Sequence, residues 1–384
     1  MRTGRPQPLV VLGLCLLALL SAMAAYGQDD TLEAKTLARL EQLRAVQAGQ
    51  SAEVNDAYNE QMNATWELFS THKEEVLPIL RSRLRAEIAR QVPSDLILLD
   101  VGFFVYLNDG AEGKEVSLDA LTRLNLESPL VLANHQELFH FVHKAAQDHA
   151  VRVLPVIERA FLRSEEEIVV PEHALILDGS RACVFLYGAY GPESEGLLRT
   201  KLADPSLARR VLEILSWLGS PDSLPEVRTA LNASPDDETF ARVASYMMRS
   251  AGPAGRDALL GLAAEGLNPG VRPSLGKIQA EARGTSFESI RASFADFPGD
   301  RGLSETEVTA RMAAMIENFG VDDRTSPIVY LDSGLSPERL ITDLSTVRSR
   351  RLFSVSDEVL GDVEITNLLI NGLRYKAALP AKEK

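Results

Sequence analysis

Cysteine is almost absent from this chain of 384 residues, which contains only Cys15 and Cys183. Cys15 lies in an N-terminal apolar stretch, so removal of that stretch would leave a single thiol. One cysteine cannot form an intramolecular disulfide, and the fold must therefore be stabilised by burial of apolar side chains. Cys183 has apolar neighbours on both sides, which predicts a buried and unreactive thiol.

The chain also lacks the short motifs that mark common catalytic and nucleotide-binding sites. It has no GxSxG nucleophile turn, no glycine-rich phosphate loop and no CxxC pair. Ser274 and Lys277 form an SxxK pattern, but the Ser-Asp-Asn and Lys-Thr-Gly motifs that accompany it in serine acylases are missing. The sequence therefore favours a role other than catalysis.

Long apolar runs are missing except at the N-terminus. There Arg2 and Arg5 precede the apolar run Leu9–Leu20, and small residues follow over 21–27. This layout is typical of a cleaved secretory signal peptide, whereas a retained membrane anchor needs about 20 apolar residues. We expect cleavage near Gln28, no stable membrane insertion afterwards, and a periplasmic or secreted protein.

Positive charge is in the minority. Without its first 27 residues the chain carries 38 basic and 54 acidic side chains, a formal balance of −16. Such a field repels phosphate, so nucleic acids and anionic lipids are not the expected partners. The remaining length, about 355 residues, is large for one hydrophobic core and favours an elongated array.

The sequence contains a recurring Leu-Pro pattern. Leu-Pro followed by apolar residues at i+3 and i+7 occurs at Leu77–Leu84, Leu154–Leu162 and Leu224–Leu231. A proline in the first turn and apolar residues on one face predict the start of a helix. Recurrence over long distances is typical of repeat proteins.

We interpret the region as successive pairs of helices. The Leu-Pro positions and those aligned with them begin the second helix of each pair, and the first helices lie between them. With Glu195 aligned to Leu224, second helices begin 41, 36, 41, 29 and 31 residues apart. Glycine and proline mark the breaks, and Ser94 and Asp236 are candidate N-caps. The expected first helices span 94–107, 129–148, 172–190, 205–218 and 236–250, and the second helices begin at 77, 118, 154, 195, 224 and 255.

The stretch Leu218–Val227 resembles the turn of a HEAT-type repeat, with a small-residue break, an Asp, and Leu-Pro opening the second helix. Looser copies occur at Tyr190–Glu193 and Ser250–Pro253. The resemblance covers about residues 71–285. It implies an all-α fold, an α-solenoid of HEAT-like helical pairs with helical caps. In that family the array is a scaffold, and a protein partner sits on the face lined by second helices.

The flanking regions also have helical patterns. Residues 31–69 are expected to form a two-helix hairpin that caps the array, and an alternative role for this hairpin is self-association in an envelope assembly. Residues 326–331 could form a short strand, but we favour an irregular connection within a C-terminal module. The expected organisation is a signal peptide (1–27), a hairpin cap (28–70), a HEAT-like array (71–285) and a C-terminal helical module (286–384). In this module, helices are predicted at 306–319, 336–347 and 362–376.

Three arginines occupy the same place after the apolar i+3 residue of a second helix: Arg81, Arg199 and Arg228. A row of guanidinium groups could bind carboxylates on a partner, so these are the candidate partner-binding residues. The alternative is that they pair with turn acids such as Asp222 between units.

Four of the six histidines form a cluster, namely His135, His140, His143 and His149. On a helix, Glu137, His140 and His143 project about 60° apart in succession, and His149 could join them from the next segment. Imidazole and carboxylate are ligands for zinc and similar divalent metals, although the spacing does not match HExxH. The alternative function is therefore a metal-binding protein or metal-dependent hydrolase, and the simpler interpretation is an ordinary amphipathic helix.

The interpretation that we favour is an exported scaffold or recognition protein that binds a partner protein on its repeat surface. It needs no cofactor. The sequence does not indicate an oligomeric state.

Overall fold

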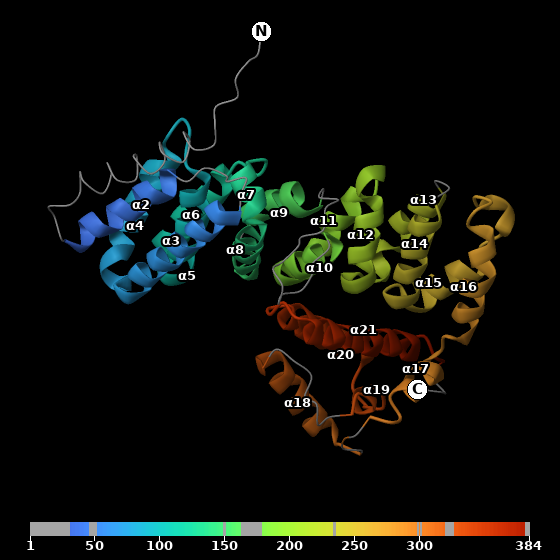
Figure 1. Cartoon of the computed structure of the whole chain (residues 1–384). Helices are drawn as coiled ribbons and strands as arrows, with labels where there is room; N and C mark the ends of the chain where they lie inside the picture. Colours follow the sequence, from blue (N-terminus) through green and yellow to red (C-terminus); the bar gives the residue numbers. More distant parts are fainter. Residues whose placement is uncertain are drawn as a thin grey trace, which may run out of the picture. The chain divides into compact units, whose positions relative to one another are not determined.

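The computed structural model of the chain describes residues 31–45, 52–148, 151–162, 179–232, 236–297, 299, 302–318 and 326–380. These residues form helices and turns and contain no β-strand (Figure 1), which confirms the all-α prediction for this part of the chain. None of the described helices is both long and apolar enough to cross a membrane. The predicted signal peptide at 1–27 lies outside the described residues. The chain divides into two compact units, Met1–Phe141 and Val142–Lys384.

Unit 1 begins with the two helices expected over 31–69, which pack on each other and on a third helix. Trp66 and Phe69 both contact the ring of Phe104, with centroids 5.0 and 5.5 Å away. The elements are α2 (Leu32–Ala45), α3 (Ala52–Thr71), α4 (Lys73–Ile88), the π-helical turn η1 (Ile97–Val101), α5 (Gly102–Asn108), α6 (Ala111–Arg123), α7 (Pro129–Ala133) and the start of α8 (His135–Gln147).

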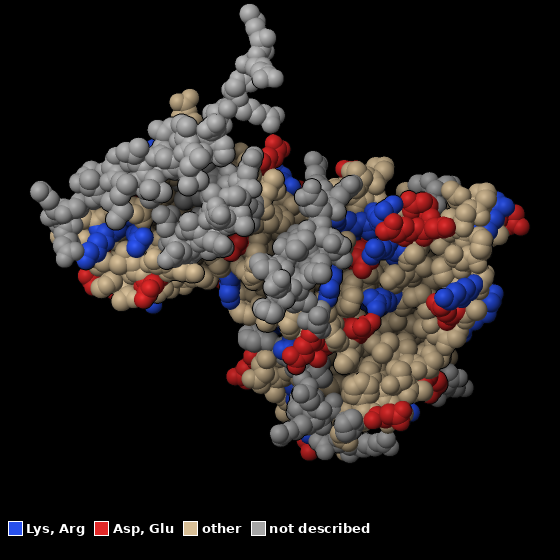
Figure 2. Space-filling model, viewed as in Figure 1, with Lys and Arg blue, Asp and Glu red and all other residues tan. Residues whose placement is uncertain are grey.

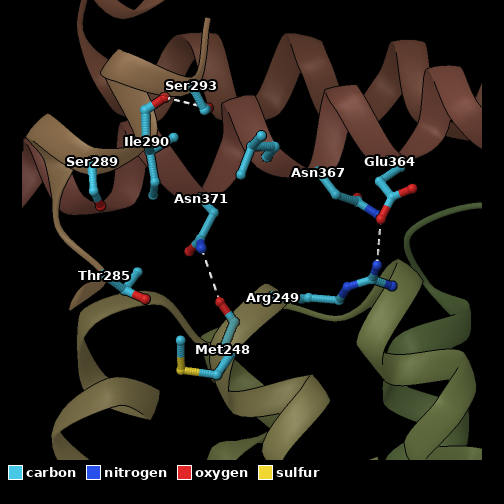
Figure 3. A pocket seen from close by; sticks show the side chains of 10 residues that line it. Met248, Arg249, Thr285, Ser289, Ile290, Ser293, Glu364, Asn367 and Asn371 are labelled. Atoms are coloured by element: carbon cyan, nitrogen blue, oxygen red, sulfur yellow. Dashed lines mark hydrogen bonds and ion pairs between the residues drawn. The ribbon is translucent and has the colours of Figure 1, made fainter. Parts of the chain in front are cut away.

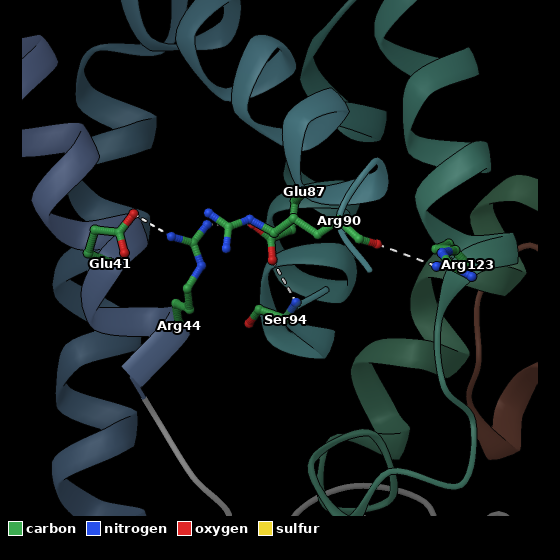
Figure 4. A network of polar contacts seen from close by, with 6 residues as sticks. All are labelled: Glu41, Arg44, Glu87, Arg90, Ser94 and Arg123. Atoms are coloured by element: carbon green, nitrogen blue, oxygen red, sulfur yellow. Dashed lines mark hydrogen bonds and ion pairs between the residues drawn. The ribbon is translucent and has the colours of Figure 1, made fainter. Parts of the chain in front are cut away.

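A buried carboxylate joins α2 to α4 in this unit (Figure 4). Glu87 is 1% exposed and pairs with Arg44 and Arg90, and it accepts a hydrogen bond of 2.7 Å from the Ser94 backbone N–H. Burial opposes the charge of Arg44, but hydrogen bonds to Glu41 and Glu87 outweigh it and raise the pKa of Arg44. The network satisfies a charge that would otherwise be costly to bury.

Unit 2 contains a row of packed helices followed by a C-terminal hairpin (Figure 1). The long helices α10, α12 and α14 pack in succession, and the shorter α11, α13 and α15 pack against them. The elements after α8 are η2 (Val151–Val153), α9 (Leu154–Ile157), η3 (Glu158–Leu162), α10 (Gly179–Tyr190), α11 (Ser194–Lys201), α12 (Pro205–Leu218), η4 (Pro221–Ser223), α13 (Leu224–Asn232), α14 (Asp237–Arg249), α15 (Gly252–Leu260), η5 (Ala264–Gly266), α16 (Arg272–Gly284), α17 (Phe287–Ser293), α18 (Glu305–Asn318), α19 (Ile328–Leu331), α20 (Pro337–Arg351) and α21 (Asp357–Ala377).

Local signals fix several helix starts as predicted. The Asp236 side chain accepts a hydrogen bond of 2.7 Å from the Thr239 N–H, which confirms it as the N-cap of α14. Of the three Leu-Pro pairs, those at Leu154 and Leu224 begin α9 and α13. The pair at Leu77 does not start a helix, because Pro78 lies inside α4.

The cause of that error is local. Helix α4 begins at Lys73, where Glu74 and Glu75 place negative charge in the first turn. Pro78 removes one backbone donor, but Val76 and Leu80 on the same helix are fully buried, and their packing holds the helix together. The second helix predicted to start at residue 118 is likewise interior to α6.

The C-terminal hairpin of α20 and α21 lies along the helical row, where it packs against α10, α12, α14 and α15 (Figure 1). Arg348 of α20 is buried and donates to the carbonyl oxygens of Trp217 and Leu218, at 3.2 and 3.0 Å. Arg374 of α21 donates to the Ser250 carbonyl oxygen. Both cations therefore cap the carboxyl ends of α12 and α14, where carbonyl groups lack partners and the helix dipole is negative.

The prediction of an irregular connection over 326–331 is wrong for most of this segment. Residues 328–331 instead form the short helix α19. Tyr330 and Leu331 are fully buried in a core that they share with α17, α18, α20 and α21. Burial within this tertiary core explains a helix that its local sequence does not predict.

Candidate functional site

The turn between α12 and α13, which carries the HEAT-like resemblance, is held by a carboxylate. Glu195 Oε1 accepts from the Ser220 N–H at 2.9 Å, from Ser220 Oγ at 2.9 Å and from Ser223 Oγ at 2.6 Å. Tyr246 donates its hydroxyl to the Ser220 carbonyl oxygen at 2.6 Å. The sequence aligned Glu195 with Leu224 but did not reveal this role, which depends on contacts to residues 25 or more positions away.

Two of the candidate arginines lie beside this turn. Arg199 of α11 is half-exposed, and its Nη1 donates to the Asp222 carbonyl oxygen at 3.1 Å. Arg228 of α13 is exposed and has no hydrogen bond or ion pair with any of the described residues. Arg199 thus contacts the turn that leads into the helix that carries Arg228, and a ligand carboxylate could reach the Arg228 guanidinium.

Arg81 is placed differently, because it belongs to the other compact unit. Its Nη1 lies 3.0 Å from Asp109 Oδ2 and 3.2 Å from Glu112 Oε2. A hydrogen bond from Arg85 and the charge of Arg81 lower the pKa of Glu112. Arg81 therefore pairs with acids near the start of α6, the arrangement that the sequence offered as the alternative.

Figure 2 shows basic and acidic side chains side by side over the region of α12 to α14. Arg209 lies 3.0 Å from Asp236 and 2.8 Å from Glu238, and Arg242 pairs with Glu213 and Glu238. Exposed pairs of this kind contribute little stability each and neutralise one another. Arg228 differs from these arginines because its charge has no acidic partner within the described part of the chain.

The histidines of α8 have contrasting surroundings. His143 is 3% exposed, its Nε2 lies 2.8 Å from the Leu352 carbonyl oxygen, and its Nδ1 lies 3.5 Å from Gln147 Nε2. A carbonyl only accepts, so Nε2 carries the proton and Nδ1 is the acceptor. His140 keeps an exposed face, but its ring is partly covered by the fold. This partial burial lowers the pKa of His140, and the charge of Glu137 opposes the shift.

These contacts bear on the zinc hypothesis. Both ring nitrogens of His143 are used within the fold, and His149 lies outside the described residues. Within the part of the chain that the structure describes, no group of three or more His, Cys, Asp or Glu side chains could hold a metal ion. Metal binding stays a prediction that this geometry does not support.

Cys183 is buried, as its apolar neighbours predict.

No protein-family model, no curated protein and no solved structure matches the chain. The fold and its contacts define the class of the protein, which is an all-α protein of many packed helices.

Proposed function

We propose that the chain is an exported scaffold or recognition protein, a HEAT-like α-solenoid with helical caps that binds a partner protein on its repeat surface. The order of long and short helices from α10 to α15 supports the solenoid assignment. The N-terminal pattern of residues 1–27 supports export and a periplasmic or secreted location.

One observation carries the binding role. Arg228 projects from the second helix α13 with no partner among the described residues, whereas nearby surface arginines are paired. An exposed guanidinium on a repeat surface is suited to a carboxylate of a partner, which it can bind through two parallel hydrogen bonds. The partner that fits this surface presents an acidic side chain or a C-terminal carboxylate.

The test combines affinity purification of the mature protein from its native envelope with binding measurements on the purified partner. We expect Arg228→Glu to weaken binding by at least about tenfold, because a like charge would then face the partner's carboxylate. Arg283→Glu is the matched control, since Arg283 is also exposed in unit 2, and it should leave the affinity unchanged. If the double variant Arg199→Ala, Arg228→Ala retained every partner at wild-type affinity, this surface would not be the binding site.

A further inference from the structure

Helices α17 to α21 of unit 2 form a module with a hydrophobic core of its own. Every buried residue of this core lies between Ile290 and Tyr375, and the partly buried residues that pack on it lie between Phe287 and Leu368. Within the described part of the chain, helices α10 to α16 contribute no side chain to this core. A segment that buries its own apolar residues can keep its fold when it moves relative to its neighbours. We call helices α17 to α21 the C-terminal module.

Hydrogen bonds to the carboxyl ends of two helices hold the C-terminal module on the helical row. Arg348 donates to two carbonyl oxygens at the end of α12, and Arg374 donates to one just beyond the end of α14. Asn371 Nδ2 donates to the Met248 carbonyl oxygen of α14 at 2.9 Å. Water can replace each of these donors when the module leaves, so the net contribution of each bond to docking is modest.

Docking also leaves buried polar atoms without partners. Arg348 Nε, Asn367 Nδ2 and Asn371 Oδ1 have no hydrogen-bond partner among the described residues, and the three side chains belong to residues only 4 to 8% exposed. Burial lowers the pKa of Arg348 and of Arg374 to about 10, so the docked state disfavours both charges. Desolvating a polar group without a partner costs free energy, which is regained when the module opens and water reaches the group.

Packing between the row and the C-terminal module is incomplete. A pocket of about 310 Å³ lies between α14, α17 and α21 (Figure 3). Met248 and Arg249 line it from the row, Ile290 and Leu368 line it from the module, and Arg249 pairs with Glu364 of α21 beside it. Closely packed interiors contain few voids larger than a water molecule, because a void forfeits contacts. The fit of the module on the row is therefore looser than that of a permanent core.

A short connection joins the row to the C-terminal module. Helix α16 ends at Gly284 and α17 begins at Phe287, so only Thr285 and Ser286 separate them. Both have extended backbone, with ψ of 119° and 170°. Gly284 is exposed, and a Cβ added there meets nothing within 4 Å. A few residues at the end of an element are the usual hinge about which one body swings relative to another.

We propose that the C-terminal module docks reversibly on the row as a folded body and swings away about Thr285 and Ser286. Opening uncovers the carboxyl ends of α12 and α14, whose carbonyl oxygens the closed molecule covers with its own donors. These oxygens are then available as acceptors, so the module controls access to this edge of the row. The motion goes beyond the recognition role of Arg228 on α13 and is tested without a partner, so the two proposals can fail separately.

Thiol labelling under native conditions tests this motion at three buried sites. Leu352→Cys places a thiol where the C-terminal module meets Gly188 of α10, Leu344→Cys places one inside the module core, and the native Cys183 reports on the row. All three positions are fully buried, and each new thiol truncates one leucine. The full chain carries Cys15→Ser, the probe is iodoacetamide, and mass spectrometry measures the labelling of each site.

We expect the thiol at position 352 to react at least about 100-fold faster than the other two, because the open module exposes it while both cores stay folded. Equal rates at all three sites would mean that only unfolding of the whole unit exposes them, which would overturn the proposal. A thiol at position 344 that reacts as fast as the one at position 352 would also overturn it, because the module would then unfold rather than swing away.

A change in the docked contacts gives a second readout. In the Leu352→Cys protein, Arg374→Met removes a donor to the carboxyl end of α14, and that carbonyl oxygen stays without a donor only while the module is docked. We expect labelling at position 352 to become at least about tenfold faster and the Cys183 rate to change by less than about twofold. Arg339→Met is the matched control, since Arg339 is exposed on α20 and pairs with Asp343 of the same helix. A rate at position 352 that did not respond to Arg374→Met would contradict the docking role of these contacts and overturn the proposal.

Discussion

Tyr246 shows how one side chain fixes the turn that defines the repeat resemblance. It is fully buried and donates to the Ser220 carbonyl oxygen, and burial raises the pKa of its hydroxyl above the ordinary value of 10.0. Above pH 10 the unfolded chain loses this proton while the folded chain keeps it. The tyrosine therefore contributes stability that is fully present below pH 10 and is lost as pH rises beyond it.

We expect Tyr246→Phe to lower the free energy of unfolding at pH 7 by about 1–2 kcal/mol, because the Ser220 carbonyl loses its donor. The same variant should lose less stability than the wild type between pH 9.5 and 10.5, because one raised pKa has been removed. Urea unfolding at pH 7, 9.5 and 10.5 measures the two effects. An unchanged slope with pH would show that the hydroxyl does not hold its proton as described.

Arginine illustrates which residue roles could be predicted. Arg81, Arg199 and Arg228 share a register in the sequence. In the structure Arg81 pairs with the acid Asp109, as the alternative interpretation has it, whereas Arg199 donates to the backbone carbonyl of Asp222 and pairs with no acid. Arg348, the arginine that is buried in the described part of the chain, was not singled out from the sequence. Its carbonyl partner Leu218 lies 130 residues away, and spacing along the chain contains no information on such a pair.

At the scale of elements, helices with strong local signals were predictable. Helix α12 begins at Pro205 after the capping Asp204 and ends before Gly219, in agreement with the predicted span of 205–218. Elements that depend on tertiary burial were missed, among them the short helix α19. Contacts between distant segments were equally hidden, since His143 contacts Leu352, 209 residues away. The metal site stays a prediction, because His149 lies outside the described residues.

Close packing of two elements can be tested at Gly188 of α10. A Cβ added there would overlap Leu352 Cδ1, and Leu352 is fully buried at the end of α20. We expect Gly188→Ala to destabilise the protein by about 1–3 kcal/mol through overpacking. Alanine normally favours a helix over glycine, so the control Gly276→Ala, where a Cβ meets nothing within 4 Å, should stabilise it by up to about 1 kcal/mol.

The double variant Gly188→Ala, Leu352→Ala isolates this contact. Leu352→Ala alone leaves a cavity, but in the double variant the new methyl group partly fills it. Denaturant unfolding should therefore give a favourable coupling energy of about 0.5–3 kcal/mol between the two changes. Additive effects would mean that α10 and the α20–α21 hairpin do not meet at this point.

At the scale of the whole molecule, the two compact units should respond separately to a change confined to one of them. Arg348 ties the hairpin of α20 and α21 to the helical row of unit 2. Burial lowers the pKa of Arg348 to about 10, with a further contribution from Arg374, so it stays charged at neutral pH. Its removal leaves the carbonyl oxygens of Trp217 and Leu218 and the Asn367 side-chain oxygen without this donor.

Arg348→Met should therefore destabilise unit 2 by about 3 kcal/mol, whereas Arg339→Met, an exposed change on the same helix, should have little effect. In calorimetry we expect one unfolding transition to move and the other to keep its midpoint. In hydrogen exchange, the carboxyl ends of α12 and α14 and the helices α20 and α21 should lose protection, while α2 to α6 should keep theirs. Equal loss of protection in α2 to α6 would contradict this prediction. It would show that losing the Arg348 hydrogen bonds in unit 2 also opens unit 1, and that the chain unfolds as one cooperative body.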